Sequence, residues 1–503
     1  MGDVRRSILF SMADKYVSQI LLIATTAAMA RILTPAETGL YMTANAVILL
    51  ADNFRTFGVG VYIVQERHLD QALVRSAFTV TLALSLAIGA LIYLCSGSIA
   101  AFYAAPDLRT LLALSALGFL AVPFSSPIMA LLQRDMAFRA VACINMAAAF
   151  TGSAITIALG IEGFGPVSYI WGFVGASFVM AALAFASRPQ GWIFLPCFVG
   201  TRRLLSFGIV SSLITVINML YDLLPKLAFG KILGFDAVGL YARAINVCQL
   251  PDRAIVSVLN PVVLPAFAAE ARAGGSLKQS YLHGLALMLS IQWPALILLS
   301  LLANPVVHLL LGPQWGAVPP LVRLMALANL ALAPAALTFP VLVSAGRLGD
   351  ALRASLISLP PSAAIIIGAA FFSLETVAAS LLLVAPFQML VAFFFVRRAI
   401  GLTASEFALT LRANGLLALG CALVPALLVA TSPTGFDLTW TRTLLALAGG
   451  GAGWTAALLA VNHPAKREIA AAGAFLLERL LPERSRKTDL HPTLQPTSRR
   501  MRS

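Results

Sequence analysis

Long apolar runs constrain this chain more than any other feature of its sequence. An apolar helix of roughly 20 residues spans the hydrocarbon core of a bilayer. Only 11% of the 503 residues are charged, against about 25% in soluble proteins. We therefore expect an all-α polytopic membrane protein and exclude a water-soluble globule. Fourteen spans are predicted, at residues 12–33, 35–64, 77–104, 110–132, 138–160, 164–187, 204–228, 237–266, 281–311, 318–345, 354–372, 374–396, 413–432 and 441–462.

Lys and Arg gather on one side of this predicted bundle. Of the 35, 26 lie on the side that holds the N-terminus, four lie on the other side and five lie inside spans. Cytoplasmic loops are enriched in these residues, so both termini are predicted to be cytoplasmic. The net charge of +14 is then a topology signal, and no nucleic-acid partner is expected. The first apolar run contains Asp14 and Lys15, and we expect no cleavable signal peptide.

Motifs for catalysis and cofactor binding are absent from the sequence. There is no G-x-x-x-x-G-K-[ST], no G-x-S-x-G and no H-E-x-x-H. The loops predicted on the outer side are only a few residues long and are too short to build a site for a sugar acceptor. We therefore predict a transporter rather than an enzyme, with no catalytic residues, no metal and no cofactor.

The sequence repeats itself at an offset of 200. Residues 31–52 and 231–252 are identical at nine of 22 positions without a gap, including a shared Gly-Leu-Tyr and a final Asp. Six predicted spans separate the copies, so the repeat is parallel and indicates two equivalent lobes. Thr34-Pro35-Ala36-Glu37 has the pattern of a capping box and predicts a sharp helix start. Pro251 should kink the eighth span.

Polar side chains form a stripe on one face of each of three predicted spans, the second, seventh and eighth. A charge at mid-bilayer costs roughly 2.5 to 3.5 kcal/mol, so such residues usually face a cavity or a partner. The stripes are Tyr41, Asn45, Asp52, Arg55 and Thr56; Asn218, Asp222 and Lys226; and Arg243, Asn246, Arg253 and Asn260. We therefore predict a central hydrophilic cavity with basic groups on both walls.

These charges allow other interpretations. Some basic residues lie near a predicted outer end and could extend to lipid head groups, namely Lys226, Arg243 and Arg323. Asp222 and Lys226 could instead pair at i, i+4. Arg31 and Lys231, at span ends, are interpreted as anchors at the membrane interface. Asp52 and Asp252 are predicted either as counter-ions of the cavity arginines or as proton or cation sites.

Three short segments also carry a resemblance to a known family. They are Ala30 to Pro35 with Gly39 to Tyr41, then Leu240 to Ala244 with Gln249 to Pro251 and Pro261 to Phe267, and finally Leu311 to Trp315 with Ala317 to Pro319. Together they resemble bacterial polysaccharide flippases, the Wzx-like branch of the multidrug/oligosaccharidyl-lipid/polysaccharide (MOP) exporter superfamily. The similarity covers about residues 5–400.

The resemblance implies a MATE-like pair of pseudo-symmetric six-helix lobes. Helices 1–6 would form the lobe at residues 1–190 and helices 7–12 the lobe at 200–400. Helices 13 and 14 would follow at 410–463, then an interfacial helix and basic tail at 464–503. It implies alternating access of the lobes, which carries a polyprenyl-diphosphate-linked oligosaccharide across the bacterial inner membrane for exopolysaccharide or lipopolysaccharide synthesis.

The resemblance also directs the assignment of the site. Substrate would bind through Arg55 and Arg253, with Arg243, Lys226, Asn45 and Asn246 beside them, and the coupling or counter-ion residues would be Asp52, Asp222 and Asp252. The expected partners are the lipid-linked oligosaccharide and membrane lipids, with a glycan polymerase and a chain-length regulator as further candidates. The alternative functions are a MATE-like drug or cation antiporter and a membrane glycan polymerase or ligase.

Overall fold

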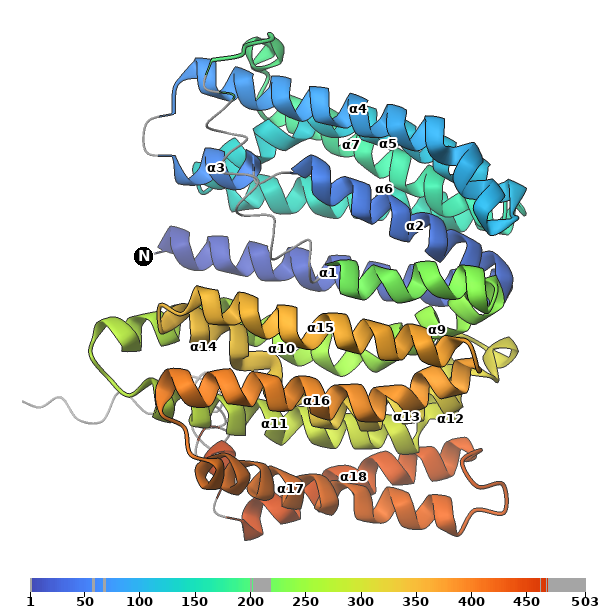
Figure 1. Ribbon diagram of the computed structural model, residues 1–503, viewed down its shortest axis with the longest axis vertical. Helices are drawn as coiled ribbons and strands as arrows, with labels where there is room; N and C mark the ends of the chain where they lie inside the picture. Colours follow the sequence, from blue (N-terminus) through green and yellow to red (C-terminus); the bar gives the residue numbers. More distant parts are fainter. Residues whose placement is uncertain are drawn as a thin grey trace, which may run out of the picture.

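The computed structural model describes residues 2–56, 59–66, 69–199, 201, 219–461, 463–466 and 468. Within these ranges every regular element is a helix, and the long helices run side by side along one common direction (Figure 1). The expected all-α membrane class is confirmed. Ten stretches of helix are long and apolar enough to cross a membrane. Each overlaps one predicted span, whereas the total of fourteen stays a prediction.

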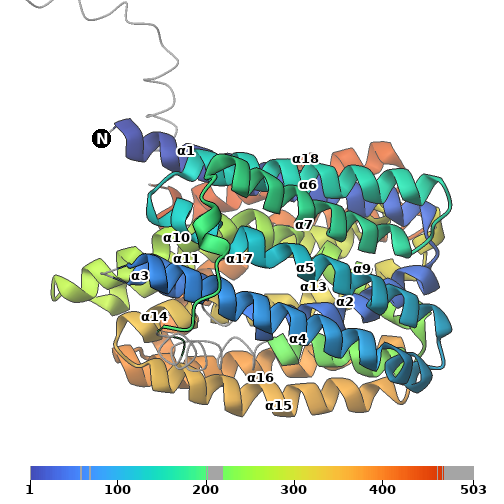
Figure 2. The ribbon, with the colours of Figure 1, turned by 90° about the horizontal axis from the view of Figure 1, so that it is seen from above.

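The N-terminal half packs around apolar side chains of α2, α4, α5 and α7. Within it α4 lies on α5, α7 lies on α5 and α6, and α1 lies on α6 (Figure 2). Its elements are α1 (Gly2–Ile32), α2 (Pro35–Thr56), α3 (Val59–Gln65), α4 (Gln71–Tyr103), α5 (Pro106–Arg134), α6 (Phe138–Ile161), α7 (Val167–Ser187) and the short η1 (Gly191–Phe194).

The C-terminal half has α13 at its centre, in contact with α9, α11 and α16. Residues 219–232 are also helical. The named elements are α9 (Phe235–Cys248), α10 (Leu250–Arg272), α11 (Leu277–Leu301), α12 (Ala303–Leu310), η2 (Pro313–Trp315), α13 (Val318–Leu332), η3 (Ala333–Leu337), α14 (Thr338–Ser344), α15 (Leu348–Ala370) and α16 (Leu374–Ile400). The hairpin of α17 (Ala404–Ala430) and α18 (Trp440–Ala460) packs on α11. The lobe limits at residues 190 and 200 stay a prediction.

Two local predictions of helix geometry are confirmed. The Thr34 amide donates to Glu37 Oε2 over 2.9 Å, and the Glu37 amide donates to Thr34 Oγ1 over 3.3 Å, which is the expected capping box at the start of α2. The predicted span at 237–266 is interrupted at Gln249, between α9 and α10. Pro251 stands just inside α10, where its missing N–H removes one bond of the helical ladder.

The two copies of the repeat pack directly against each other, as α2 against α9. A Cβ atom built on Gly39 would lie 1.7 Å from the carbonyl oxygen of Phe235, and one on Gly239 would lie 2.1 Å from that of Pro35. Both distances are far below a van der Waals contact, so any side chain would push the helices apart. The glycines of the shared Gly-Leu-Tyr are therefore required by a contact of backbone on backbone.

Candidate functional site

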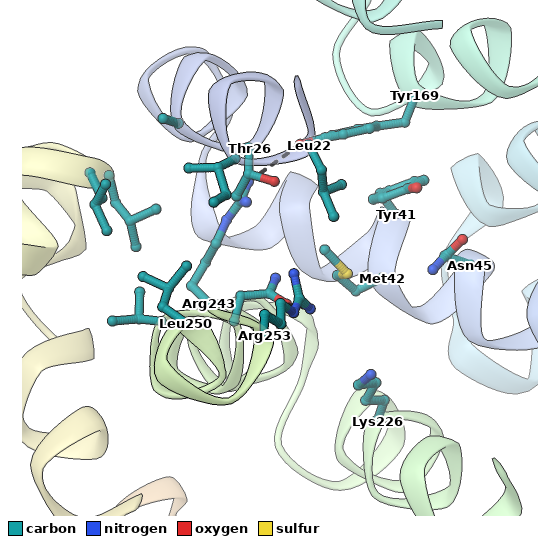
Figure 3. Close-up of a pocket in the computed structure, with 16 residues that line it drawn as sticks. Leu22, Thr26, Tyr41, Met42, Asn45, Tyr169, Lys226, Arg243, Leu250 and Arg253 are labelled. Carbon is teal, nitrogen blue, oxygen red and sulfur yellow. Dashed lines mark hydrogen bonds between the residues drawn. The ribbon is translucent and has the colours of Figure 1, made fainter. Parts of the chain in front are cut away.

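A cavity of about 230 Å³ lies between the two copies of the repeat (Figure 3). Helices α1, α2 and α7 line it from the N-terminal half, and residues 219–232 with α9, α10 and α12 line it from the C-terminal half. Five of the six predicted binding residues are on its wall: Asn45, Lys226, Arg243, Asn246 and Arg253. The predicted stripes of spans two, seven and eight therefore do face a common space.

The wall of this cavity is positively charged. Among the described residues, its lining includes three cationic side chains, Lys226, Arg243 and Arg253, and no carboxylate. Figure 3 shows Arg243 and Arg253 reaching in from the α9 to α10 segment and Lys226 from a neighbouring helix, while Asn45 approaches from α2. Like charges enclosed by apolar walls repel one another more strongly than in water, because the local dielectric constant is lower. Such a cavity is prepared for an anion.

Arg243 is the most buried of the three cations, with only 1% of its surface exposed. One Nη2–H donates to the hydroxyl of Tyr169 over 3.5 Å, and the guanidinium lies 5.3 Å from the ring centroid of Trp315. Nε and Nη1 are buried and have no hydrogen-bond partner among the described residues. The alternative that Arg243 extends to lipid head groups is therefore wrong. Its unused donors are costly to bury and would be satisfied by a ligand.

Arg253 and Lys226 are half-buried. Arg253 Nη2 donates to Gln249 Oε1 over 3.0 Å and to Asn246 Oδ1 over 3.5 Å. These amides lie four and seven residues earlier in the chain, a helical spacing that puts them on the same face as Arg253. These two contacts, both with uncharged amide oxygens, orient the guanidinium. Asn246 thus has a positioning contact in addition to its place on the wall.

The predicted acidic residues do not line the cavity, although Asp222 lies one helical turn before Lys226 and interacts with it electrostatically. Asp252 accepts a hydrogen bond from the side-chain amide of Gln292 on α11, whereas Asp222 is exposed and Asp52 is half-buried on α2. None of the three lines the cavity. Their assignment as coupling or counter-ion residues stays a prediction.

Several predicted residues fall outside what the structure describes. The backbone of Arg55 belongs to α2, but its side chain is outside the described part, as is that of Asn260 in α10. Asn218 lies outside the described residues altogether, and so does most of the predicted interfacial helix and tail at 464–503. The role of Arg55 stays a prediction.

An aromatic pair on the cavity wall was not predicted as such. The rings of Tyr41 and Tyr169 stack at a centroid distance of 4.1 Å, with 10° between their planes. Tyr41 belongs to the polar stripe of the second span, whereas Tyr169 belongs to no predicted stripe. Trp315, which lies over Arg243, is part of the third family segment, but the resemblance does not predict this contact. Neither pairing can be read from sequence spacing.

The sequence is similar to those of known proteins. The sequence model of a family described as "Polysaccharide biosynthesis protein" matches residues 28–320. The chain is 26% identical over 308 residues to the lipopolysaccharide biosynthesis protein WzxC of Escherichia coli. This aligned region covers 60% of this chain and 62% of WzxC. The chain is also 26% identical over 356 residues to the succinoglycan biosynthesis transport protein ExoT of Rhizobium meliloti. That aligned region covers 68% of this chain and 70% of ExoT.

One solved structure shares the fold over most of its length. The inward closed conformation of the lipid II flippase MurJ superposes with a TM-score of 0.72 and covers 90% of this chain and 98% of MurJ. The two sequences are only 12% identical, so this likeness shows the fold alone. The region matched by the family model begins in α1 and ends just inside α13. It therefore includes both repeat copies and the cavity-lining parts of every helix except α1, whose lining residues, Leu22 to Ala27, precede it.

Proposed function

The chain belongs to the polysaccharide biosynthesis protein family, and from this premise we propose that it flips a lipid-linked oligosaccharide across a bacterial inner membrane. The substrate we propose is an oligosaccharide joined through a diphosphate to a polyprenyl lipid, on its way to an exopolysaccharide or lipopolysaccharide. The names of the relatives WzxC and ExoT, one for biosynthesis and one for transport, support this class. We further propose that the protein is a transporter and not an enzyme.

The observation that carries the proposal is the basic cavity between the crossing repeat copies. A diphosphate presents several charged oxygens, and guanidinium groups bind such oxygens in pairs through charge-assisted hydrogen bonds. Arg243 has two buried donors without a partner, and Arg253 and Lys226 lie on the same wall. We assign the diphosphate to these cations, with Arg55 as a further contact, and sugar hydroxyls to Asn45 and Asn246. The polyprenyl chain would stay in the bilayer.

The transport cycle we propose is alternating access. The lobes at 1–190 and 200–400 would rock about their contact, with residues 410–463 attached to the second lobe. The cavity would receive the head group from the cytoplasmic side and release it outside. The asymmetry of Lys and Arg, 26 against four, supports this orientation and the placement of both termini in the cytoplasm.

The alternative functions meet specific difficulties. A carrier of lipophilic cations should present carboxylates to its cavity, whereas the described wall has none. A glycan polymerase or ligase needs loops that hold an acceptor, and the helix connections at the end away from the N-terminus are short. They are residues 33–34, 104–105, 162–166, 233–234, 311–317, 371–373 and 431–439, none longer than nine residues. Both observations favour the flippase.

Binding of undecaprenyl diphosphate to the purified protein in detergent tests the assignment. Replacing Arg253 and Lys226 by Gln should weaken binding about tenfold or more, since each charge-assisted hydrogen bond is worth roughly 1.5 to 3 kcal/mol. Arg109→Gln, on an exposed arginine of α5, is the matched control and should bind as the parent does. In cells, Arg55→Ala with Arg253→Ala should abolish polymer export while the protein still inserts. Unchanged affinity of the Gln variant, or binding of tetraphenylphosphonium instead of the diphosphate, would reject the proposal.

A further inference from the structure

The bundle end away from the N-terminus holds two equivalent contacts between the halves. Arg31, in the last turn of α1, donates from Nη2 to the carbonyl oxygen of Leu309 over 3.0 Å. Lys231 stands at the matching position of the second repeat copy, and its ammonium donates to the carbonyl oxygen of Phe102 over 2.5 Å. The expectation that these two residues are only interfacial anchors is therefore incomplete. Each one crosses from its own half to the other.

The acceptors of these two bonds are also equivalent. Phe102 lies one residue before the end of α4, and Leu309 lies one residue before the end of α12. These helices belong to the third and ninth predicted spans, which hold the same place in the two lobes. The last carbonyls of a helix lack intrahelical donors and carry its negative dipole end, so a cation is stabilised there. The two bonds thus form a pseudo-symmetric pair of latches.

The latches flank the glycine crossing of α2 and α9. At that crossing the backbones touch at Gly39 and Gly239, where neither residue places a side chain between the two helices. Arg31 and Lys231 are both exposed, and their partners are main-chain oxygens. Breaking a latch therefore returns each cation to water or lipid head groups and leaves no charge buried. A contact built in this way can open and close repeatedly.

A third contact ties this end of the bundle to the cavity. The indole Nε1–H of Trp315 donates to the carbonyl oxygen of Ala30, near the end of α1, over 2.7 Å. Trp315 is fully buried, and its ring lies 5.3 Å from the guanidinium of Arg243. One side chain of the C-terminal half therefore contacts both the N-terminal half and the deepest cation of the cavity.

We propose that Arg31, Lys231 and the Gly39/Gly239 crossing form the outer gate, and that Trp315 couples this gate to Arg243. The proposal rests on the flippase function and the orientation proposed above. Diphosphate oxygens that bind Arg243 would draw its guanidinium away from Trp315. The indole would then hold Ala30 less firmly, and the halves would part at this end to release the head group outward. Trp315 is thus a positioning residue, since it acts through Arg243 and through the gate.

A cysteine introduced at a buried position between the halves can report whether the gate is open. Thr43 of α2 is fully buried, and its oxygen lies 3.2 Å from where a Cβ on Gly230 would stand, between the halves. Thr43→Cys would be introduced after replacement of the five native cysteines. Its labelling by a membrane-impermeant maleimide in spheroplasts would then measure opening to the outside. Arg31→Gln with Lys231→Gln should raise the labelling rate roughly tenfold, because two charge-assisted hydrogen bonds that favour the closed state are lost.

Two controls decide the meaning of that result. Arg109→Gln removes an exposed cation at the same end of the bundle and should leave the rate at the parent value. The charge-conserving pair Arg31→Lys and Lys231→Arg should restore slow labelling, which a general loss of folding would not allow. Labelling of the Gln pair at the parent rate, or an equal rise in Arg109→Gln, overturns the gate.

The coupling has its own pair of variants. Trp315→Phe keeps a ring over Arg243 and loses only the donor to Ala30, whereas Trp454→Phe loses an equivalent donor to Ser290 within the C-terminal part. Undecaprenyl diphosphate should accelerate labelling in the parent and in Trp454→Phe, and should have no effect in Trp315→Phe, whose basal rate is already raised. A ligand response in Trp315→Phe equal to that of the parent overturns the coupling. If the diphosphate fails to bind at all, the proposed substrate fails, while faster labelling of the Gln pair would still establish the gate.

Discussion

Replacing Arg243 by Met should make the protein more stable and less able to bind its substrate. Arg243 is almost completely buried, with Nε and Nη1 unsatisfied among the described residues. An apolar side chain of similar length removes that cost. A buried charge that lowers the stability of the protein is expected to serve a function.

The contacts of Arg243 set the size of the effect. Each unsatisfied buried donor costs about 1 to 3 kcal/mol. The cation–π contact with Trp315 returns up to about 2 kcal/mol, and the 3.5 Å bond to Tyr169 is at the limit of a hydrogen bond. We therefore expect Arg243→Met to raise the free energy of unfolding by about 1 to 4 kcal/mol, the range found when buried charges are replaced by apolar residues. Loss of the charged donors should weaken diphosphate binding by roughly 10- to 150-fold.

Thermal unfolding in detergent and binding of undecaprenyl diphosphate measure the two effects on one preparation. Arg323→Met is the control outside the cavity. Arg323 is half-buried in the C-terminal half and has one unsatisfied buried donor, Nε, against two in Arg243, but it donates to Asn304 and lies 3.9 Å over the ring of Phe436. It should lower the melting temperature and leave binding unchanged. A destabilised Arg243→Met that still binds with parental affinity would refute the reasoning, since Arg243 would then be a structural residue.

Three further changes test separate parts of the structure. Gly39→Ala places a methyl group 1.7 Å from the Phe235 carbonyl and should cost about 1 to 3 kcal/mol; Gly97→Ala, which meets nothing within 4 Å, should not destabilise the protein in the same melting assay. Thr34→Ala removes the cap of α2 and should cost about 0.5 to 2 kcal/mol by thermal unfolding. Burial lowers the pKa of His463, so its folded state binds a proton less readily than the unfolded state. Stability should fall as the pH drops below about 6.5, and His463→Gln should flatten this part of a melting-temperature profile.

Most of the fold and of the cavity could be predicted because both follow from the bilayer. Apolar length located the spans, and helical periodicity together with depth selected Asn45, Lys226, Arg243, Asn246 and Arg253, all of which line the cavity. Depth in the bilayer is informative because a polar side chain that faced hydrocarbon would be costly, so such a side chain usually faces a cavity or a partner inside the protein. Pro251 was predictable for a related reason, since its missing N–H breaks the helical ladder whatever the surroundings.

Contacts between distant residues could not be predicted in this way. The stack of Tyr41 on Tyr169 joins α2 to α7, and Trp315 reaches both Ala30 and Arg243 across many helices. Such pairs depend on the angle and depth at which helices cross, which periodicity does not define. For the same reason a cation at a span end has two equivalent interpretations from sequence, as an anchor in lipid or as a contact with another half.

The glycine crossing resolves that ambiguity and links the gate to the cavity. Because Gly39 and Gly239 bring α2 and α9 into backbone contact, they fix how closely the two repeat copies approach. Both the gate contacts and the cavity depend on this crossing. At one end Arg31 and Lys231 reach helix termini of the opposite half, and farther into the bundle the polar faces of the crossing helices enclose the cations. Helices α1 and α2, which supply seven of the residues on this wall, are not among the ten described helices apolar enough to cross a membrane by composition. Their departure from the apolar pattern is the physical requirement of a carrier whose cargo has a charged head group, since the bilayer excludes such a group everywhere except where the protein itself provides polar contacts.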